Sequence, residues 1–468
     1  MSNAARRVAL IAAIAVAVLA AGDAAPAHGA SFTVNATHDS VDAAPGDGVC
    51  ADTGGACTLR AAVEETNALA GADAVVVPAG TYVLTVTEQV QGGADIAGLR
   101  VRGDVTLTGA GAAITIIDGG GQAVVVSAGK DSPNPVSLEI SDLSIRNGNG
   151  PTTAGGIDTT ASSTLTLRRV ALTGNSGSTG GLRVRGTANV VDSLIAGNAA
   201  AASGGGILVQ GTLTVTNSTI SGNSAQSSGG GIRADGTTSI TNVTIALNTS
   251  GGASGGVQAR NSIFASNGSP DCIISQGHNL VADPCAPLTG PGDLGGVDPQ
   301  MTGLQDNGGP TLTHGLYPGS PAIDAGDSAV CPGTDQRGVP RSQGAACDIG
   351  AYEYVPPAQQ PPAAPPDTAP PAAPATAAPT AAVTPRATAS PSPSPSASAT
   401  AATRAARRAR PATPFPNAPD ADFVVEEESG GGSPWLTLGL GTMGVLGVAG
   451  GVAGGGYWYR RRRRGRLR

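Results

Sequence analysis

The fold follows from residues 155–257, where one glycine-glycine-aliphatic triplet returns at steps of 25 residues: Gly155-Gly156-Ile157, Gly180-Gly181-Leu182, Gly205-Gly206-Ile207, Gly230-Gly231-Ile232 and Gly255-Gly256-Val257. A second marker is an apolar residue three positions before an asparagine. It occurs at Leu172/Asn175, Ile195/Asn198, Ile220/Asn223, Ile245/Asn248 and Phe264/Asn267. A fixed period of this length indicates a solenoid in which each repeat packs on its neighbours.

Each repeat contains short runs of alternating apolar and polar residues. In residues 204–228 these runs are Ile207-Leu208-Val209, Leu213-Thr214-Val215 and Thr219-Ile220-Ser221, separated by Gly, Asn or Ser. Such alternation predicts three short strands per coil, because successive side chains of a strand point to opposite faces. The many glycines, asparagines and threonines disfavour a helical repeat. The sequence therefore predicts an all-β, parallel β-helix with coils of about 25 residues.

The repeated asparagines fit the same architecture. Asparagine tolerates a left-handed bend, and identical side chains one coil apart can form hydrogen bonds along the stack. We therefore interpret them as structural. The glycosylation sequons at Asn217, Asn242 and Asn248 are interpreted as by-products of the repeat.

Residues 1–30 predict a signal peptide, with Arg6 and Arg7 before an apolar run and Ala25-Pro26-Ala27 as the cleavage motif. A retained N-terminal anchor is the weaker alternative. Export predicts disulfides among the six cysteines, but the sequence leaves their connectivity open. Because the cysteines fall into three close pairs, we expect neighbours to bond: Cys50–Cys57, Cys272–Cys285 and Cys331–Cys347. Their spacing does not match the Cys-x-x-Cys pairs of zinc sites. Residues 31–354 carry 13 basic and 27 acidic residues, a formal charge of −14, which argues against a nucleic-acid partner.

The C-terminal part predicts a membrane anchor. Residues 355–433 are rich in Pro, Ala, Thr and Ser, which predicts a disordered stalk. A run of 25 uncharged residues from Trp435 to Tyr459 predicts one transmembrane helix, and the arginines that follow predict a cytoplasmic tail. Gly447, Gly451 and Gly455 permit helix pairing in the membrane, or are simply tolerated there.

Two regions carry a family resemblance. Cys57-Thr58-Leu59-Arg60-Ala61-Ala62, followed by Pro78-Ala79-Gly80-Thr81-Tyr82, resembles the CSLREA domain, with Ala61 in place of glutamate. The C-terminal motifs resemble the choice-of-anchor Q domain. They are Asn307-Gly308-Gly309-Pro310-Thr311, His314, Ser320-Pro321-Ala322-Ile323-Asp324, Asp335-Gln336-Arg337-Gly338 and Asp348-Ile349-Gly350-Ala351-Tyr352-Glu353. The resemblance implies a right-handed β-helix of the pectin-lyase type and implies no activity. Independently, the helix-like stretch from Thr58 to Leu69 predicts a short N-terminal capping helix.

The best candidate for a binding site is a polar stripe beside the Gly-Gly strands. Alternation places its members outward: Asp158, Arg183, Arg185, Arg233, Asp235 and Arg260. Arginines suit carboxylated glycans or a protein partner. The alternative is that these charges pair across coils and only keep the sheet soluble.

Catalysis and metal binding have little support. No clustered carboxylates of a lyase or hydrolase are visible, and Gly252-Ala253-Ser254-Gly255-Gly256 lies in a Gly/Ser repeat rather than at a nucleophile elbow. His278 and His314 are interpreted as making loop hydrogen bonds. A last acidic group could bind Ca²⁺ or pair with Arg337 and Arg341, and we expect pairing; it comprises Asp324, Asp327, Asp335, Asp348 and Glu353. Apart from this possible structural Ca²⁺, no cofactor is expected.

The predicted organisation is a signal peptide (1–30), a cap with the first coils (31–100), β-helix repeats (101–268), a C-terminal segment (269–354), the stalk (355–433), the transmembrane helix (434–459) and the arginine-rich tail (460–468). We expect a non-catalytic, membrane-anchored bacterial surface protein that interacts with envelope glycans or a surface protein. The alternative is a polysaccharide lyase or glycoside hydrolase. The sequence leaves the ligand and the oligomeric state open.

Overall fold

The computed structural model describes residues 29–89 and 96–357. The predicted transmembrane helix and cytoplasmic tail, nearly all of the stalk and all but two residues of the signal peptide lie outside these residues. Among the residues described, no helix is long and apolar enough to cross a membrane.

The largest sheet has sixteen strands and consists of two arms that converge on one long strand, β24 (Ile232–Thr241). The first arm contains the predicted Gly-Gly strands, and we call it the Gly-Gly arm. Its strands are β5 (Ile96–Val101), β8 (Val124–Ala128), β12 (Ile157–Thr159), β16 (Leu182–Val184) and β20 (Ile207–Val209). A short strand, β4 (Glu88–Gln89), pairs antiparallel with β5.

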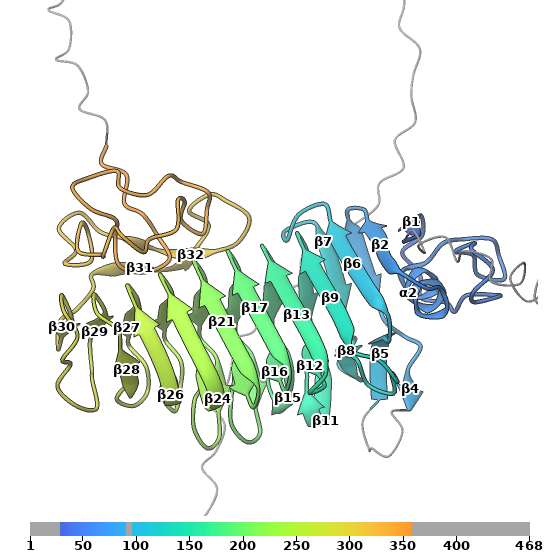
Figure 1. Cartoon of the computed structure of the whole chain (residues 1–468), viewed down its shortest axis with the longest axis horizontal. Helices are drawn as coiled ribbons and strands as arrows, with labels where there is room; N and C mark the ends of the chain where they lie inside the picture. The colour runs from blue at the N-terminus through green and yellow to red at the C-terminus, as the bar shows by residue number, and fades with distance from the viewer. Residues whose placement is uncertain (1–28, 90–95, 358–468) are drawn as a thin grey trace, which may run out of the picture. The chain divides into compact units, whose positions relative to one another are not determined.

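The second arm is rich in threonine, and we call it the Thr arm (Figure 1). Its strands are β1 (Ser31–Thr33), β2 (Ala72–Val77), β6 (Asp104–Gly109), β9 (Val136–Ser141), β13 (Ser163–Arg168), β17 (Thr187–Val191) and β21 (Thr212–Thr216). Beyond β24 the sheet continues through β26 (Ala253–Arg260) and β28 (Ile273–Ser275).

A ten-stranded sheet, sheet B, follows the Thr arm around each coil. Its strands are β3 (Gly80–Val83), β7 (Thr115–Asp118), β10 (Ser144–Arg146), β14 (Ala171–Thr173), β18 (Leu194–Ala196), β22 (Thr219–Ser221), β25 (Thr244–Ala246), β27 (Ile263–Ala265), β29 (Leu280–Val281) and β30 (Leu294–Gly295). A four-stranded sheet, sheet C, completes the central coils with β11 (Asn149–Ala154), β15 (Ser176–Thr179), β19 (Ala199–Ala200) and β23 (Ser224–Ala225).

Parallel pairing between successive coils confirms a parallel β-helix. Ile157 pairs with Leu182, Leu182 with Ile207, and Ile207 with Ile232, each partner lying 25 residues further along the chain. The same spacing joins Ile195 to Ile220 in sheet B. The predicted coil length is therefore correct for the central repeats.

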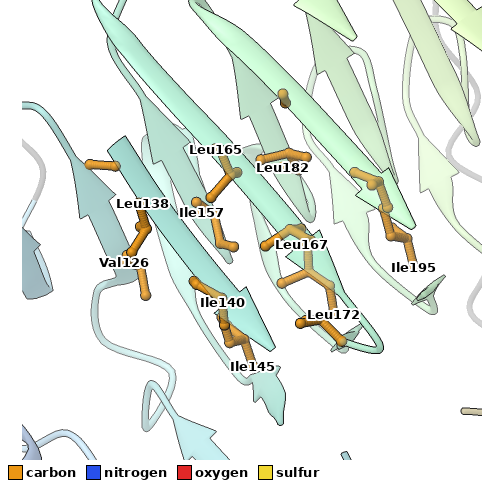
Figure 2. Close-up of a cluster of buried hydrophobic side chains, with 14 of the residues drawn as sticks. Val126, Leu138, Ile140, Ile145, Ile157, Leu165, Leu167, Leu172, Leu182 and Ile195 are labelled. Carbon is orange, nitrogen blue, oxygen red and sulfur yellow. The ribbon is translucent and has the colours of Figure 1, made fainter. Parts of the chain in front are cut away.

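Aliphatic side chains from both arms of the large sheet and from sheet B fill the interior (Figure 2). Ile157 and Leu182 of the Gly-Gly arm, Leu165 of the Thr arm and Leu172 of sheet B are fully buried. They point toward one another across the coil. Burial of each such side chain stabilises the fold by roughly 1.5–3 kcal/mol, so the stack of repeats, rather than any single coil, supplies the core.

The second glycine of the first four triplets is required by the close approach of successive coils. A Cβ atom on Gly206 would lie 2.6 Å from the carbonyl oxygen of Gly231, and one on Gly181 would lie 2.6 Å from that of Gly206. Backbone carbonyls cannot move aside as a flexible side chain can. The repeated triplet thus marks a corner where only glycine fits.

The asparagines form a hydrogen-bonded ladder, as predicted. Nδ2 of Asn198 donates to Oδ1 of Asn223 at 2.9 Å, and Asn223 donates likewise to Asn248 at 3.0 Å. The predicted left-handed bend lies elsewhere, because the residue before each of these asparagines adopts it, as Gly222 does with φ of 63°. The ladder ends where Nδ2 of Asn267 donates to the carboxylate of Asp271 at 2.8 Å.

The N-terminal cap contains the one helix found among the described residues, α2 (Leu59–Ala68). Oγ1 of Thr58 caps it by accepting the backbone N–H of Ala61 at 3.1 Å. The three cysteine pairs predicted from sequence are all disulfide-bonded: Cys50–Cys57, Cys272–Cys285 and Cys331–Cys347.

The segment predicted at 269–354 has two parts. Its first part continues the β-helix through β28, β29 and β30. Its second part, residues 299–354, begins with an antiparallel pair, β31 (Met301–Gln305) and β32 (Thr313–Leu316), and runs back along sheet B (Figure 1). We call residues 299–354 the return segment.

Candidate functional site

The predicted charged stripe on the Gly-Gly arm consists mainly of ion pairs. Asp158 and Arg183 face each other across coils in a two-point contact, with N–O distances of 2.6 and 2.9 Å, and both are nearly buried. Nη1 of Arg183 also donates to the carbonyl of Thr152. Arg185 is 33% exposed, and its guanidinium lies 3.9 Å from Asp158.

The second pair of the stripe lies on one strand. Arg233 and Asp235 of β24 form an exposed ion pair at 2.6 Å, and Arg233 also donates to Ser228. The interpretation that these charges pair across coils is therefore correct for Asp158 and Arg183, whereas Arg233 and Asp235 pair within one strand. Arg185 keeps the greater freedom for an external anion.

Arg260 does not belong to the stripe. The coil after Ile232 is shortened, so that Ile232 pairs with Ala253 rather than with Val257. Val257 pairs with Thr238, and Arg260 pairs with Thr241 on the Thr arm side of β24. The Gly255-Gly256-Val257 triplet therefore keeps the sequence period but has left the Gly-Gly corner.

The Thr arm presents an ordered polar surface of hydroxyl and amide groups. Two outward columns cross the central coils in register: Ser137, Thr164, Thr187, Thr212 and Thr237 in one, and Thr166, Asn189, Thr214 and Ser239 in the other. All of these residues are exposed or half-buried. Among the residues described, none of their side chains hydrogen-bonds to another part of the protein. Strand geometry sets about 4.8 Å between neighbours within a column and about 6.7 Å between columns.

This surface is open, whereas sheet B is partly covered by the return segment. Figure 1 shows the strands of the Thr arm side by side with no segment across them. On sheet B, by contrast, Gln336 accepts the Thr219 hydroxyl at 2.6 Å, and at the bend that leads into this sheet Asn242 donates to the carbonyls of Asp348 and Gly350. The Thr arm is therefore a face that the return segment leaves open to a large ligand.

His314 fastens the return segment to sheet B. Its Nδ1 lies 2.8 Å from the carbonyl of Thr302, which can only accept, so Nδ1 carries the proton. Nε2 then accepts the hydroxyl of Ser221 at 2.9 Å. Burial lowers the pKa of His314. His278 likewise contacts a backbone carbonyl, that of Ala325 at 2.8 Å, so both histidines make the expected loop hydrogen bonds.

Two of the five residues of the acidic group, Asp335 and Glu353, pair with arginines as expected. The other three, Asp324, Asp327 and Asp348, accept backbone N–H groups of the same segment. Arg337 pairs with Asp335 at 2.7 Å, and Arg341 pairs with Glu353 at 3.3 Å, with all four side chains nearly or fully buried. The guanidinium of Arg337 also stacks on Tyr352, 3.6 Å from the ring centre. Burial raises the pKa of nearby Asp348 to about 6.

Three asparagines that sequence reasoning did not connect with the return segment hold it in place. Asn217, Asn242 and Asn261 adopt the left-handed bend between the Thr arm and sheet B. Asn217 accepts from Arg341 and donates to the carbonyl of Thr334, and Asn261 bonds the backbone of Asp327. The steps of 25 and 19 residues between them were the available signal. The sequons at Asn217, Asn242 and Asn248 are buried in the fold.

Hollows occur where the return segment meets sheet B. One, of about 250 Å³, lies between Leu194, Ala171 and residues 309–312. A neighbouring, more open depression includes Leu304 and Leu312. Neither brings together carboxylates, and within 29–89 and 96–357 no group of three or more His, Cys, Asp or Glu side chains could hold a metal ion. Ser254 lies inside strand β26, not at an elbow.

Comparison with known proteins gives little more. No family model matches the sequence, and no curated protein matches it significantly, so membership of the CSLREA and choice-of-anchor Q families stays a prediction. Among solved structures, the crystal structure of pectate lyase Pel9A is similar over 70% of this chain and 97% of that chain, with a TM-score of 0.41 and 14% identity. The fold assigned to this chain rests on its own strand pairing.

Proposed function

We propose that this chain is a non-catalytic, exported protein of the bacterial cell surface, anchored by its C-terminal helix, that binds envelope or extracellular polysaccharide along the Thr arm. The observation that carries the proposal is the open surface of registered hydroxyl and amide groups. Sugar hydroxyls both donate and accept hydrogen bonds, as threonine, serine and asparagine side chains do.

The charges of the protein support a neutral rather than an anionic ligand. Four of the six residues of the predicted stripe are used in ion pairs, and Arg260 lies apart from them. Within β9, β13, β17 and β21 the charged residues are Glu139, in register with Thr166, and Arg168. A polymer rich in free hydroxyls therefore suits this surface better than a polyuronate does.

The expected binding is weak at each coil and strengthened by repetition. Sugar-binding sites gain much of their affinity from exposed aromatic rings, but Phe32, Tyr82 and Phe264 are buried and the exposed Tyr317 belongs to the return segment. When one coil holds a polymer, the equivalent contacts on the next coils meet its neighbouring sugars at a high effective concentration, which raises the overall affinity. Long polymers should then bind where short oligosaccharides do not.

Export and anchoring are supported by the cysteines and by the sequence. Three disulfides form in the described part, and disulfides persist in oxidising compartments. The leader, stalk, apolar run and arginine tail remain predictions from residues outside the described part.

The test is binding of the purified chain to insoluble neutral glucans, pectin, alginate and peptidoglycan. A triple variant Thr187→Ala, Thr212→Ala and Thr214→Ala should lose most glucan binding. A matched control, Thr53→Ala, Thr81→Ala and Thr289→Ala, removes three exposed threonines outside the Thr arm and should bind as the parent does. Equal binding by both variants would refute the proposed surface.

The same experiment separates the alternatives. Release of reducing ends or unsaturated sugars, with or without Ca²⁺, would show an enzyme. The protein could instead prefer pectin or alginate and lose this preference in the variant Arg183→Ala, Arg185→Ala and Arg233→Ala. That result would identify the charged stripe as the binding site.

A further inference from the structure

Asp73 in β2 is a buried acid that lacks a full set of partners. Asp73 is 2% exposed, and its Oδ1 accepts the backbone N–H of Ala30 at 2.6 Å. Oδ2 is buried and has no hydrogen-bond partner. Among the residues described, no basic side chain forms an ion pair with it. A buried carboxylate is costly unless it is paired and hydrogen-bonded.

Ala30 stands at the junction between the predicted leader and the fold. Its carbonyl accepts the N–H of Ala74 at 2.8 Å, and Ser31 pairs with Ala74 as β1 begins. Ala30 is therefore fixed beside Asp73 by the sheet. In an uncut chain its nitrogen is an amide with one hydrogen, which the contact with Oδ1 uses up.

We propose that signal peptidase hydrolyses the bond between Gly29 and Ala30, and that the new α-ammonium of Ala30 pairs with Asp73. Water adds across the peptide bond, leaving a carboxylate on Gly29 and a protonated amine on Ala30. The ammonium has three donors and a full charge, enough for both oxygens of Asp73. The inference rests on the export proposed above.

The sequence around this bond is suitable. Ala27-His28-Gly29 places small residues at the two positions that an A-x-A-like motif requires. The motif first expected, Ala25-Pro26-Ala27, would leave His28 as the first residue and Ala30 still an amide. Cleavage after Ala30 would remove the donor altogether. Only the cut before Ala30 supplies a charge to Asp73.

The first test is the N-terminal sequence and intact mass of the exported protein from a bacterial host. The expected first residue is Ala30. A chain starting at His28 or Ser31 would overturn the proposed site while leaving export intact. A full-length, uncut chain in the membrane would overturn the site and favour a retained N-terminal anchor, whereas a chain that stays in the cytoplasm would overturn the proposed export.

The second test measures the ammonium itself. Two forms of the chain, one starting at Ala30 and one at His28, are released from cleavable fusions and purified in detergent. Gly29 is kept in the longer form because any Cβ there would lie 1.6 Å from the carbonyl oxygen of Ala72. Near pH 7 the Ala30 form should melt at least about 2 °C higher.

The pH dependence has a definite sign. An unpaired α-amino group titrates at about 7.7–8.0, and pairing raises this pKa in the folded protein. The added stability is therefore present below about pH 8 and lost as the pH rises through the folded value. Between pH 7 and pH 10 the Ala30 form should lose its advantage. Asp73→Asn should abolish the difference between the two forms at every pH; equal melting of the unmutated forms at pH 7 would refute the pairing.

Discussion

Replacing Asn223 by alanine tests whether the asparagine ladder holds the coils in register. Asn223 is fully buried. Its Oδ1 accepts the backbone N–H and the Nδ2 of Asn198 at 3.0 and 2.9 Å, while its own Nδ2 donates to the carbonyl of Ile195 and to Asn248. The variant therefore leaves two buried donors on Asn198 without that acceptor.

The expected cost follows from those two groups. A buried donor without a partner costs about 1–3 kcal/mol, so Asn223→Ala should lower the free energy of unfolding by about 2–6 kcal/mol. Urea denaturation followed by circular dichroism measures this as a lower midpoint with an unchanged slope. The control is Asn189→Ala, which removes a partly exposed side chain without a hydrogen bond and should stay within about 0.5 kcal/mol of the parent.

The direction of the ladder gives a second, sharper expectation. In Asn223→Asp the carboxylate can still accept from Asn198, but it faces the acceptor oxygens of Asn248 and Ile195 at about the same distances. Aspartate should therefore be no better than alanine here, although the aspartate side chain has nearly the same shape as that of asparagine. A parent-like midpoint for either variant would refute the role given to the ladder.

Four further predictions concern the end of the ladder and the return segment. Burial raises the pKa of Asp271 to about 6. The contribution of Asp271 to stability is therefore present below about pH 4 and lost as the pH rises through 6. Between pH 4 and 7, the melting temperature of the parent minus that of Asp271→Asn should fall as the pH rises. Burial lowers the pKa of His314. The contribution of His314 to folding stability is therefore present above about pH 6.5 and lost as the pH falls. Between pH 7 and 5 the melting temperature of the parent should fall more than that of His314→Gln. Glu353→Gln should cost about 3–5 kcal/mol in urea because Arg341 stays buried without its carboxylate, whereas Asp235→Asn, in an exposed pair, should cost less than about 1 kcal/mol. Replacing Cys331 and Cys347, 16 residues apart, by serine should cost about 3 kcal/mol and speed amide exchange in the return segment; unchanged exchange would show that its side-chain contacts suffice.

The repeat could be predicted because each coil needs the same residues at the same corners. Gly206 meets the carbonyl of the next coil, and Asn223 donates to the next asparagine. Such contacts join residues 25 positions apart and leave a period in the sequence. The disulfides were also predictable, since the cysteines of each pair are neighbours in sequence.

The 25-residue period gave a wrong prediction at the coil after Ile232, because the loop there is shorter although the Gly-Gly marker keeps its spacing. Gly255-Gly256 looks like a further corner, yet the structure aligns Ala253 with Ile232, so Arg260 was placed on the wrong face. Asp271 was missed as the end of the ladder because it is the only member that is not an asparagine. The contacts of Asn217 and Asn242 with the return segment span 106 to 124 residues, and nothing local in the sequence indicates them.

The path of the return segment has a mechanical consequence. If the chain is tethered through its C-terminus, a pull reaches Glu353 and Tyr354 first. Glu353 is bound to Arg341, whose guanidinium bonds Asn217, and Ala351 bonds Thr244. The load therefore enters the solenoid through its middle coils, where several bonds share it, instead of peeling strands one by one from the last turn at β30. We expect such a surface protein to resist drag on the cell far better than one whose final coil led straight to its anchor.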